Sequence, residues 1–433
     1  MTLIESFIII VFMIGVLVLS GIPVAVALGF TGLFGFYAFL DKGMATTIGI
    51  ITFNMMNSFI MVAIPLFVLM GCLLLRGGIG EKLYKGVSNL IHGLPGGLLH
   101  GNIMSCSIFA AICGSTTATA ATIGTIAIPE LEKRGYDRKL IAGSLAAGGT
   151  LGILIPPSLQ FILYGVLTET SVGKLFMAGM IPGLILSGLM MTYIFIRILI
   201  QPQLQPPLVQ NMNLKARLTS LVNLLPIGLL ILVVLGGIYL GIMTPTESAA
   251  IGASGALILS VIYRSLSWKS LKDSLTESIR VTAMVLFIMM SANLFTCVLV
   301  NMRVPTLILD IINSLHLSPF MVLIFIIFSY LLLGCFFDAV SMTIITIPVY
   351  FPIIVKMGYD PIWFGVINVL MCEVSTITPP VGLNLYVIQG LRTDYQSKDI
   401  IWGSVPFVLV IFIMAGILIA WPEIALWLPK QMR

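Results

Sequence analysis

Long apolar segments, separated by short polar ones, occupy almost the whole chain of 433 residues. A helix needs about 20 consecutive apolar residues to cross a bilayer, and the segments reach roughly this length or exceed it. They lie at 3–20, 22–40, 58–75, 96–128, 140–168, 172–200, 220–241, 246–263, 281–301, 318–355, 361–390 and 404–427. The pattern predicts an all-α integral membrane protein.

The second half of the chain repeats the first. Pro129 matches Pro352, Gly135-Tyr136-Asp137 matches Gly358-Tyr359-Asp360, and Pro156-Pro157 matches Pro379-Pro380, all at the same offset along the chain. A constant offset indicates a duplicated unit, as in many secondary transporters. We predict a first repeat at 1–205 and a second at 220–433, joined by the polar linker 206–219.

Two apolar segments are interrupted at matching places by proline pairs. Pro156-Pro157 ends a glycine-containing run at 148–158, and Pro379-Pro380 ends the run at 373–382. Proline lacks the N–H donor and clashes with the preceding turn, so neighbouring carbonyls lose their helical partners. Inside a bilayer this is tolerated only where the backbone is buried in protein or lines a wet cavity. The two broken helices therefore predict a binding site.

Two other segments are too long for one crossing and contain central interruptions. Residues 96–128 are interrupted at 113–117, and residues 318–355 at 334–338. We interpret each as a re-entrant hairpin, the first near 96–133. Each repeat then has five crossings and one hairpin, and the odd number places the repeats in opposite orientations.

The positive charges define an orientation. With the N-terminus outside, 16 of the 22 lysines and arginines lie inside. The other six are Lys42, Lys174, Arg303, Lys356, Lys430 and Arg433. Cytoplasmic loops of membrane proteins carry the excess of basic residues. Both termini are therefore predicted to face the periplasm.

Three stretches are amphipathic instead of continuously apolar: Ile79–Leu94, Ser267–Ile279 and Pro305–Leu315. A helix with one apolar face can lie in the plane of the membrane interface. We predict that these stretches lie there and brace a moving domain; ordinary loop helices are the alternative.

Composition and motifs exclude several classes of protein. With 59% hydrophobic and 9% charged residues, a soluble fold is excluded. The chain has no G-x-x-x-x-G-K-[ST] phosphate loop, C-x-x-C pair or catalytic constellation. We expect no enzyme activity, no organic cofactor and no nucleic-acid partner. Energy for transport must come from an ion gradient or another subunit.

Three carboxylates lie within apolar segments, where an ionisable residue is a functional candidate by default. Glu247 follows Thr244-Pro245-Thr246 at a helix start, which favours a capping role. Asp338 stands at the interruption of the second hairpin, opposite Ser115 in the first. Glu373 could be a proton site, a support for neighbouring ligands or a residue that reaches to the interface, and the sequence does not rank these.

Hydroxyls, one carboxylate and freed carbonyls are hard oxygen ligands, and the unwound backbone of broken helices is where transporters bind Na⁺. We predict two sodium/substrate sites and at least two coupling ions. Site 1 comprises Gly114, Ser115, Thr116, Thr117, Gly149, Gly152, Ile155 and Pro156. Site 2 comprises Gly334, Asp338, Thr376, Thr378, Pro379 and Gly382. Plain helix packing is the alternative for such small residues.

Four motifs together resemble the large membrane subunit of tripartite ATP-independent periplasmic (TRAP) transporters. They are Gly114-Ser115-Thr116-Thr117-Ala118-Thr119, Ile155-Pro156-Pro157-Ser158, Thr244-Pro245-Thr246-Glu247-Ser248-Ala249 and Thr378-Pro379-Pro380-Val381-Gly382. The resemblance implies an elevator-type carrier in the bacterial inner membrane, similar in fold to divalent anion/sodium symporters. It also implies a small four-helix membrane subunit, a periplasmic substrate-binding protein and Na⁺-driven uptake of an organic acid such as a dicarboxylate or sialic acid.

Some relatives carry an acidic residue near Thr119, which this chain lacks. Their ion number and substrate are therefore not transferred to it. A self-sufficient Na⁺ or H⁺ symporter, without a binding protein, is the nearest alternative. An ion channel is disfavoured, because paired broken helices differ from a ring of identical filters.

Overall fold

The computed structural model describes residues 3–40, 45–91, 93–206 and 214–432, and these residues form helices joined by turns. The first-repeat helices are α1 (Leu3–Leu19), α2 (Val24–Phe39), α3 (Ala45–Met56), η2 (Phe59–Val62), α4 (Ala63–Arg76), α5 (Ile79–Ile91), α6 (Leu98–Cys113), α7 (Thr116–Arg134), α8 (Arg138–Leu154), α9 (Leu159–Thr168), α10 (Val172–Ile200) and η3 (Pro202–Leu204). The others are α11 (Leu214–Tyr239), α12 (Pro245–Ile262), α13 (Trp268–Asn301), α14 (Val304–Ser314), α15 (Pro319–Gly334), α16 (Ala339–Lys356), α17 (Pro361–Thr376), α18 (Leu383–Leu391), α19 (Ser397–Ala420) and α20 (Glu423–Gln431).

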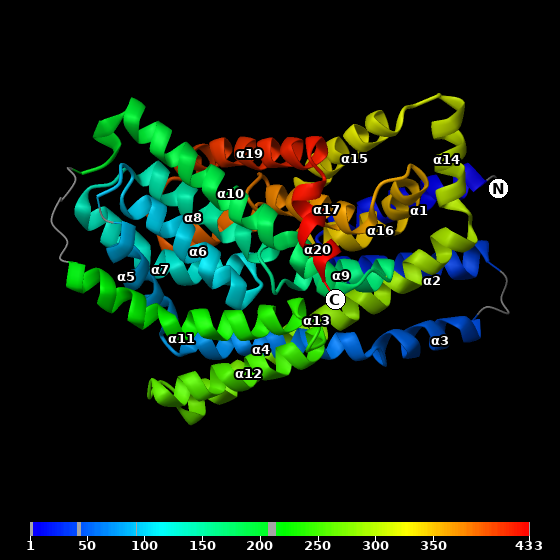
Figure 1. Cartoon of the computed structure of the whole chain (residues 1–433). Coiled ribbons are helices and arrows are strands. Elements are labelled where there is room, and N and C mark those ends of the chain that lie inside the picture. Colours follow the sequence, from blue (N-terminus) through cyan, green and yellow to red (C-terminus); the bar gives the residue numbers. More distant parts are fainter. Residues whose placement is uncertain (1–2, 41–44, 92, 207–213, 433) are drawn as a thin grey trace.

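Seven helical segments of the described residues are long and apolar enough to cross a membrane: Phe59–Arg76, Arg138–Thr168, Val172–Ile200, Pro245–Ile262, Trp268–Asn301, Ala339–Lys356 and Ser397–Ala420. Shorter apolar helices, among them Val24–Phe39 and Pro361–Thr376, accompany them. Most of the long helices run along one direction, which α14 and α20 cross (Figure 1). The prediction of an all-α membrane protein is confirmed.

Both predicted hairpins are present. Gly114 and Ser115 alone separate α6 from α7, and residues 335–338 separate α15 from α16. Gly114 has a left-handed backbone conformation, with φ at 61°, which glycine adopts without a Cβ clash. Ser115 then caps the N-terminus of α7 by accepting a bond from the N–H of Ala118. A glycine that permits the turn and a hydroxyl that begins the next helix produce the first tip.

Both predicted broken helices are present too. The interruption between α8 and α9 contains Pro156-Pro157, and that between α17 and α18 contains Pro379-Pro380. The order hairpin, broken helix, long helix occurs in α6–α10 and again in α15–α19. Residues 207–213 of the predicted linker lie outside the described residues, so the repeat boundaries stay predictions.

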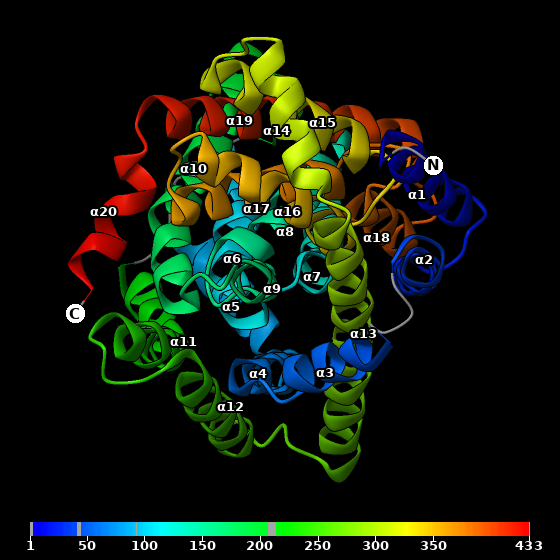
Figure 2. The same ribbon diagram turned by 90° about the vertical axis from the view of Figure 1, so that its right-hand side faces the viewer.

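The helices form an outer and a central group. In the outer group, α4 packs against α12 and α13, α2 against α13, and α11 against α12. Gly29, Gly32 and Gly35 of α2 face α13, where a Cβ on Gly32 would lie 3.1 Å from the backbone N of Phe295. Such small residues allow close packing of membrane helices. Figure 2 shows α2 to the right of the central group and α3, α4, α11 and α12 below it; the central group consists of α6–α9 and α15–α19.

Two short helices connect the groups. α5 packs against α11 of the outer group and against α6 and α7 of the central group, while α14 packs against α13 and α16. Both were predicted as amphipathic helices and are separate elements. The third stretch, Ser267–Ile279, is different: it continues without a break into α13. Helical propensity and packing against α4 extend the helix through this polar part, so the prediction of a separate interfacial helix is wrong there.

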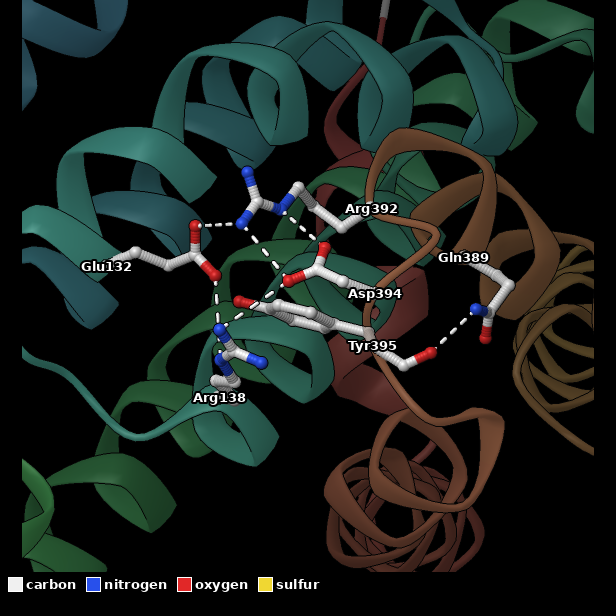
Figure 3. Close-up of polar contacts among 6 residues, drawn as sticks. All are labelled: Glu132, Arg138, Gln389, Arg392, Asp394 and Tyr395. Carbon is white, nitrogen blue, oxygen red and sulfur yellow. Dashed lines mark hydrogen bonds and ion pairs between the residues drawn. The ribbon is translucent and has the colours of Figure 1, made fainter.

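An ion-pair network connects the first hairpin to the loop between α18 and α19 (Figure 3). Arg392 Nη2 lies 2.8 Å from Glu132 Oε2, and Arg138 Nη2 lies 3.5 Å from Asp394 Oδ2. Tyr395 is 3% exposed beside them, and burial, followed by the Glu132 carboxylate, raises the pKa of its hydroxyl. The network ties the end of α7 in the first repeat to a distant segment of the second.

The tightest helix crossing joins α8 to α19. A Cβ on Gly143 would overlap the carbonyl oxygen of Gly403, and a Cβ on Gly403 would overlap the carbonyl oxygen of Lys139. The Lys139 amino group also lies 3.4 Å from Asp399 Oδ1 at the same end. Because two backbones touch here, neither glycine can gain a side chain without separating the helices.

Gly143→Ala should therefore destabilise the protein by about 1–3 kcal/mol, the usual cost of overpacking a filled interior. Gly416→Ala on α19 is the matched control, because a Cβ there meets nothing within 4 Å. The thermal unfolding midpoint of purified protein measures both. Equal midpoints for the two variants would contradict the close crossing.

Candidate functional site

The tip of the first hairpin lies against the break between α8 and α9. A Cβ on Gly152 would be 2.5 Å from the Ser115 carbonyl oxygen, and one on Gly149 would be 3.1 Å from the Thr116 carbonyl oxygen. A Cβ on Gly114 would be 2.7 Å from the Pro157 carbonyl oxygen. Glycine at these positions lets two backbones meet. Most predicted residues of site 1 are thus brought together.

Three predicted residues of site 1 remain: Thr117, Ile155 and Pro156. Thr117 lies in the first turn of α7, with its Oγ1 at 3.4 Å from Ser115 Oγ. Ile155 ends α8, and its side chain packs against Gly183 of α10, so only its backbone can serve the site. Pro156 follows, at the cis Pro156-Pro157 bond.

At site 2 the second hairpin packs against the end of α17, just before the break. Gly334 closes α15 against Ser375 of α17, where a Cβ on the glycine would be 2.9 Å from the serine Cβ. Thr376 Oγ1 donates to the Glu373 carbonyl at 2.8 Å, and Thr378 Oγ1 donates to the Val374 carbonyl at 2.6 Å. Each threonine uses its single proton on the helix, so its lone pairs remain able to bind a cation.

The rest of site 2 is defined by backbone conformation and by helix capping. Gly382 has φ at 32° and begins α18, just after the cis Pro379-Pro380 bond. Asp338 caps α16: its carboxylate accepts from the N–H groups of Val340 at 3.1 Å and Ser341 at 3.4 Å, and from the Ser341 hydroxyl. Asp338 therefore has a structural role, which leaves its predicted role as an ion ligand untested.

An amide side chain of each repeat donates a hydrogen bond to a helix of the other repeat. Gln160 at the start of α9 donates through Nε2 to the Ala339 carbonyl at 2.7 Å and to the Thr343 hydroxyl, both in α16. Asn384 at the start of α18 donates through Nδ2 to the Ala146 carbonyl of α8 at 3.0 Å. Neither residue was singled out from the sequence. Gln160 follows Pro157 by three residues and Asn384 follows Pro380 by four, so each lies shortly after a proline pair, and this was the available signal.

The other two carboxylates of the apolar segments, Glu247 and Glu373, have different outcomes. Glu247 forms a reciprocal capping box with Thr244, so the capping prediction is confirmed. Glu373 is 0% exposed, which excludes a side chain that reaches the interface. Its neighbour Thr150 donates to the Ala147 carbonyl at 2.8 Å, and neither Glu373 oxygen has a hydrogen-bond partner among the described residues.

A cavity of about 430 Å³ lies between the first hairpin tip and the outer group. Ser115 and Thr117 line one wall, and residues of α4 and α13, including Arg76 and Glu277, line the other. Arg76 pairs with Asp273 at 3.3 Å, and both side chains are partly exposed. Ligand pockets for small molecules have volumes of about 300–1,000 Å³, so the cavity has room for a small organic molecule beside site 1.

The donor sets fit Na⁺ better than a transition metal. In the described residues no cluster of three histidine, cysteine or acidic groups could hold a metal ion. The groups that do converge are carbonyls, hydroxyls and an amide. One of them, Asn384 Oδ1, is buried without a hydrogen-bond partner in the described part of the chain. Broken-helix carbonyls and similar neutral oxygens are the ligands that transporters use for Na⁺.

The architecture has a counterpart among solved structures. The chain superposes on the Alcanivorax borkumensis YdaH transporter with a TM-score of 0.64, covering 90% of this chain and 89% of that one, at 15% sequence identity. At this low identity the likeness shows the fold alone.

Sequence relatives identify the family. Residues 10–424 match the family described as "Tripartite ATP-independent periplasmic transporter, DctM component". The chain is 36% identical to a C4-dicarboxylate TRAP transporter large permease protein of Pseudomonas aeruginosa, over 87% of this chain and 88% of that protein. It is 30% identical to a sialic acid TRAP transporter large permease protein of Vibrio cholerae, over 96% of each. The chain therefore belongs to the large-permease (DctM) family of tripartite ATP-independent periplasmic transporters.

Proposed function

We propose that this chain is the translocating subunit of a sodium-coupled importer for a small organic acid. The observation that carries the proposal is the contact of the first hairpin turn with the break between α8 and α9, which brings backbone and hydroxyl oxygens together, with the second hairpin packed against the end of α17. The cavity beside Ser115 and Thr117 supplies space for the acid. C4-dicarboxylates and sialic acid, named for two relatives, define the expected class of substrate.

In this proposal the bound Na⁺ and the adjoining cavity bind the organic acid together. A bound Na⁺ supplies positive charge that draws a carboxylate into the adjoining cavity. Ser115 and Thr117 donate hydroxyl hydrogen bonds to that carboxylate, and Arg76 provides a cation at the far wall. The apolar side chains of Val68, Val281 and Val387, which also line the cavity, exclude water from the carbon part of the substrate.

The division into two helix groups supports an elevator movement. The central group contains both hairpins and both broken helices, whereas α4 and α13 of the outer group form the far wall of the cavity. Sliding the central group would carry both sites across the membrane past a fixed wall. The short helices α5 and α14, which contact both groups, would bend or tilt as connecting arms.

The family implies two further components, a small membrane subunit and a periplasmic binding protein. We propose that a four-helix subunit lies on the lipid-facing side of the outer group, where Phe30, Tyr37, Phe53 and other large apolar side chains are exposed. The binding protein would deliver the acid from the periplasm. The test is co-purification: recovery of a small hydrophobic protein bound to the chain would support this arrangement over a self-sufficient symporter.

Sodium coupling predicts a specific requirement for transport. In proteoliposomes with the small subunit and the binding protein supplied, uptake should need an inward Na⁺ gradient and should not respond to ATP. Radiolabelled substrate uptake in sodium buffer and in choline buffer of equal ionic strength measures this. Equal uptake in both buffers contradicts sodium coupling.

Asp338→Asn should weaken sodium dependence without loss of folding, because asparagine also caps helices well. Loss of the carboxylate charge removes about 1–4 kcal/mol of attraction, which raises the half-maximal sodium concentration roughly 5- to 1000-fold. Asp360→Asn is the matched control, since Asp360 likewise accepts two backbone N–H bonds, at the start of α17. Identical sodium curves for both variants would assign Asp338 to capping alone.

Ser115→Ala removes a neutral hydroxyl and should cost less, about 0.5–1.5 kcal/mol. Because Ser115 also caps α7, Ser318→Ala at the start of α15 controls for the loss of a cap. The half-maximal sodium concentration for uptake should rise in Ser115→Ala and stay unchanged in Ser318→Ala. A parallel response of the two variants contradicts the assignment of Ser115 to site 1.

The charge distribution predicts that both termini face the periplasm. A reporter that is active only in the periplasm should be active after Arg433 and inactive when inserted within 207–213. A reporter active only in the cytoplasm should give the opposite result. A cytoplasmic C-terminus would contradict the inverted-repeat interpretation.

A further inference from the structure

Three asparagines are completely buried among the described residues: Asn102, Asn368 and Asn384. Asn102 donates to Ser144 Oγ at 2.9 Å and accepts from the Tyr84 hydroxyl at 3.2 Å. Asn368 donates to Thr343 Oγ1 at 3.0 Å and accepts from the Tyr330 hydroxyl at 2.8 Å. Asn384 differs, because its Oδ1 has no partner in the described part of the chain.

The position of Asn384 makes this oxygen informative. Its Nδ2 donates to the Ala146 carbonyl at 3.0 Å, which holds the amide plane against α8. The same Nδ2 lies 3.0 Å from the position of a Cβ on Gly149, and the Thr116 carbonyl oxygen lies 3.1 Å from that position. Since Oδ1 and Nδ2 are bonded to the same carbon, the free oxygen lies where α8, the first hairpin tip and α18 meet.

A buried amide oxygen without a donor destabilises the fold, because it has lost its bond to water and gained none in return. Native proteins satisfy such atoms with protein groups, water or bound ions. A neutral amide oxygen beside the tip of a hairpin is also a suitable Na⁺ ligand. An unpaired oxygen at this place therefore indicates a partner that is not part of this chain.

We propose that Asn384 contributes its amide oxygen as a ligand to the cation at site 1, so that a residue of the second repeat completes the ion site of the first. The inference rests on the proposed sodium coupling. It also gives α18 two roles, because this helix begins at Gly382 of site 2. Ion binding at site 1 then fixes the helix that borders site 2.

The test uses Na⁺ alone as the ligand and stability as the readout, without transport. The full chain, purified with its small subunit, is heated in NaCl at rising concentration, with choline chloride holding the ionic strength constant. A ligand that binds only the folded state raises the unfolding midpoint progressively as its concentration exceeds its dissociation constant. The half-saturating Na⁺ concentration is obtained by fitting this rise.

Asn384→Ala should raise the half-saturating Na⁺ concentration at least tenfold. Asn102→Ala, the matched control, should lower the midpoint in choline and leave the half-saturating concentration unchanged, because the Asn102 amide is already satisfied by protein groups. Asn384→Asp, which keeps an oxygen and adds a negative charge, should bind Na⁺ at least as tightly as the unaltered chain. It also provides a result if Asn384→Ala does not fold.

The outcomes distinguish failure of the Asn384 assignment from failure of the proposed sodium coupling. An Na⁺-dependent midpoint in the unaltered chain, with the same half-saturation in Asn384→Ala, overturns the role of Asn384 and leaves sodium coupling standing. Weakened binding in Asn384→Asp likewise overturns that role. If the unaltered chain does not respond to Na⁺, both sodium coupling and this inference fail.

Discussion

Satisfaction of backbone polar groups within a bilayer is the constraint on which this structure depends. Helices satisfy these groups internally, and every interruption releases some of them. The chain interrupts itself at two hairpin turns and two proline pairs, and in the first repeat the structure places the turn directly against the break. The released groups are thereby enclosed by protein. The same enclosure brings the carbonyl oxygens of Ser115, Thr116 and Pro157 close to α8 and to the turn of the first hairpin.

Protein can enclose these backbone groups only where two backbones approach closely, and glycine permits this approach at selected positions. Gly149 and Gly152 admit the backbone of the first hairpin, while Gly143 and Gly403 let α8 and α19 touch. These contacts make α8 the centre of the molecule: it packs against α6, α7, α17 and α19. A side chain at any of these glycines would force apart backbones that now touch. The candidate site and the core of the fold therefore depend on the same contacts.

Local chemistry predicted much of this architecture. Proline pairs located the broken helices, and glycine followed by serine located the first hairpin turn. The sequence could not show that Ser267–Ile279 would continue into α13, because contacts with α4, namely the Arg76–Asp273 pair and the bond from Ser278 to the Pro65 carbonyl, support this polar part of the helix. It also did not single out Gln160 and Asn384, whose partners lie 179 and 238 residues away. Contacts of this separation follow from the packing of the two repeats and not from any local pattern.

Duplication explains one more feature, at the crossing of α8 and α17. Thr150 and Glu373 are separated by the constant offset of the repeat, so they are equivalent positions of the two halves, and they lie beside each other. Equivalent residues can meet only near the axis that relates the repeats. At this point the repeats differ in chemistry, since one contributes a hydroxyl that is already bonded and the other a carboxyl group without a partner among the described residues. This one difference, a threonine in one repeat and a glutamate in the other, therefore makes the two halves unequal where they touch.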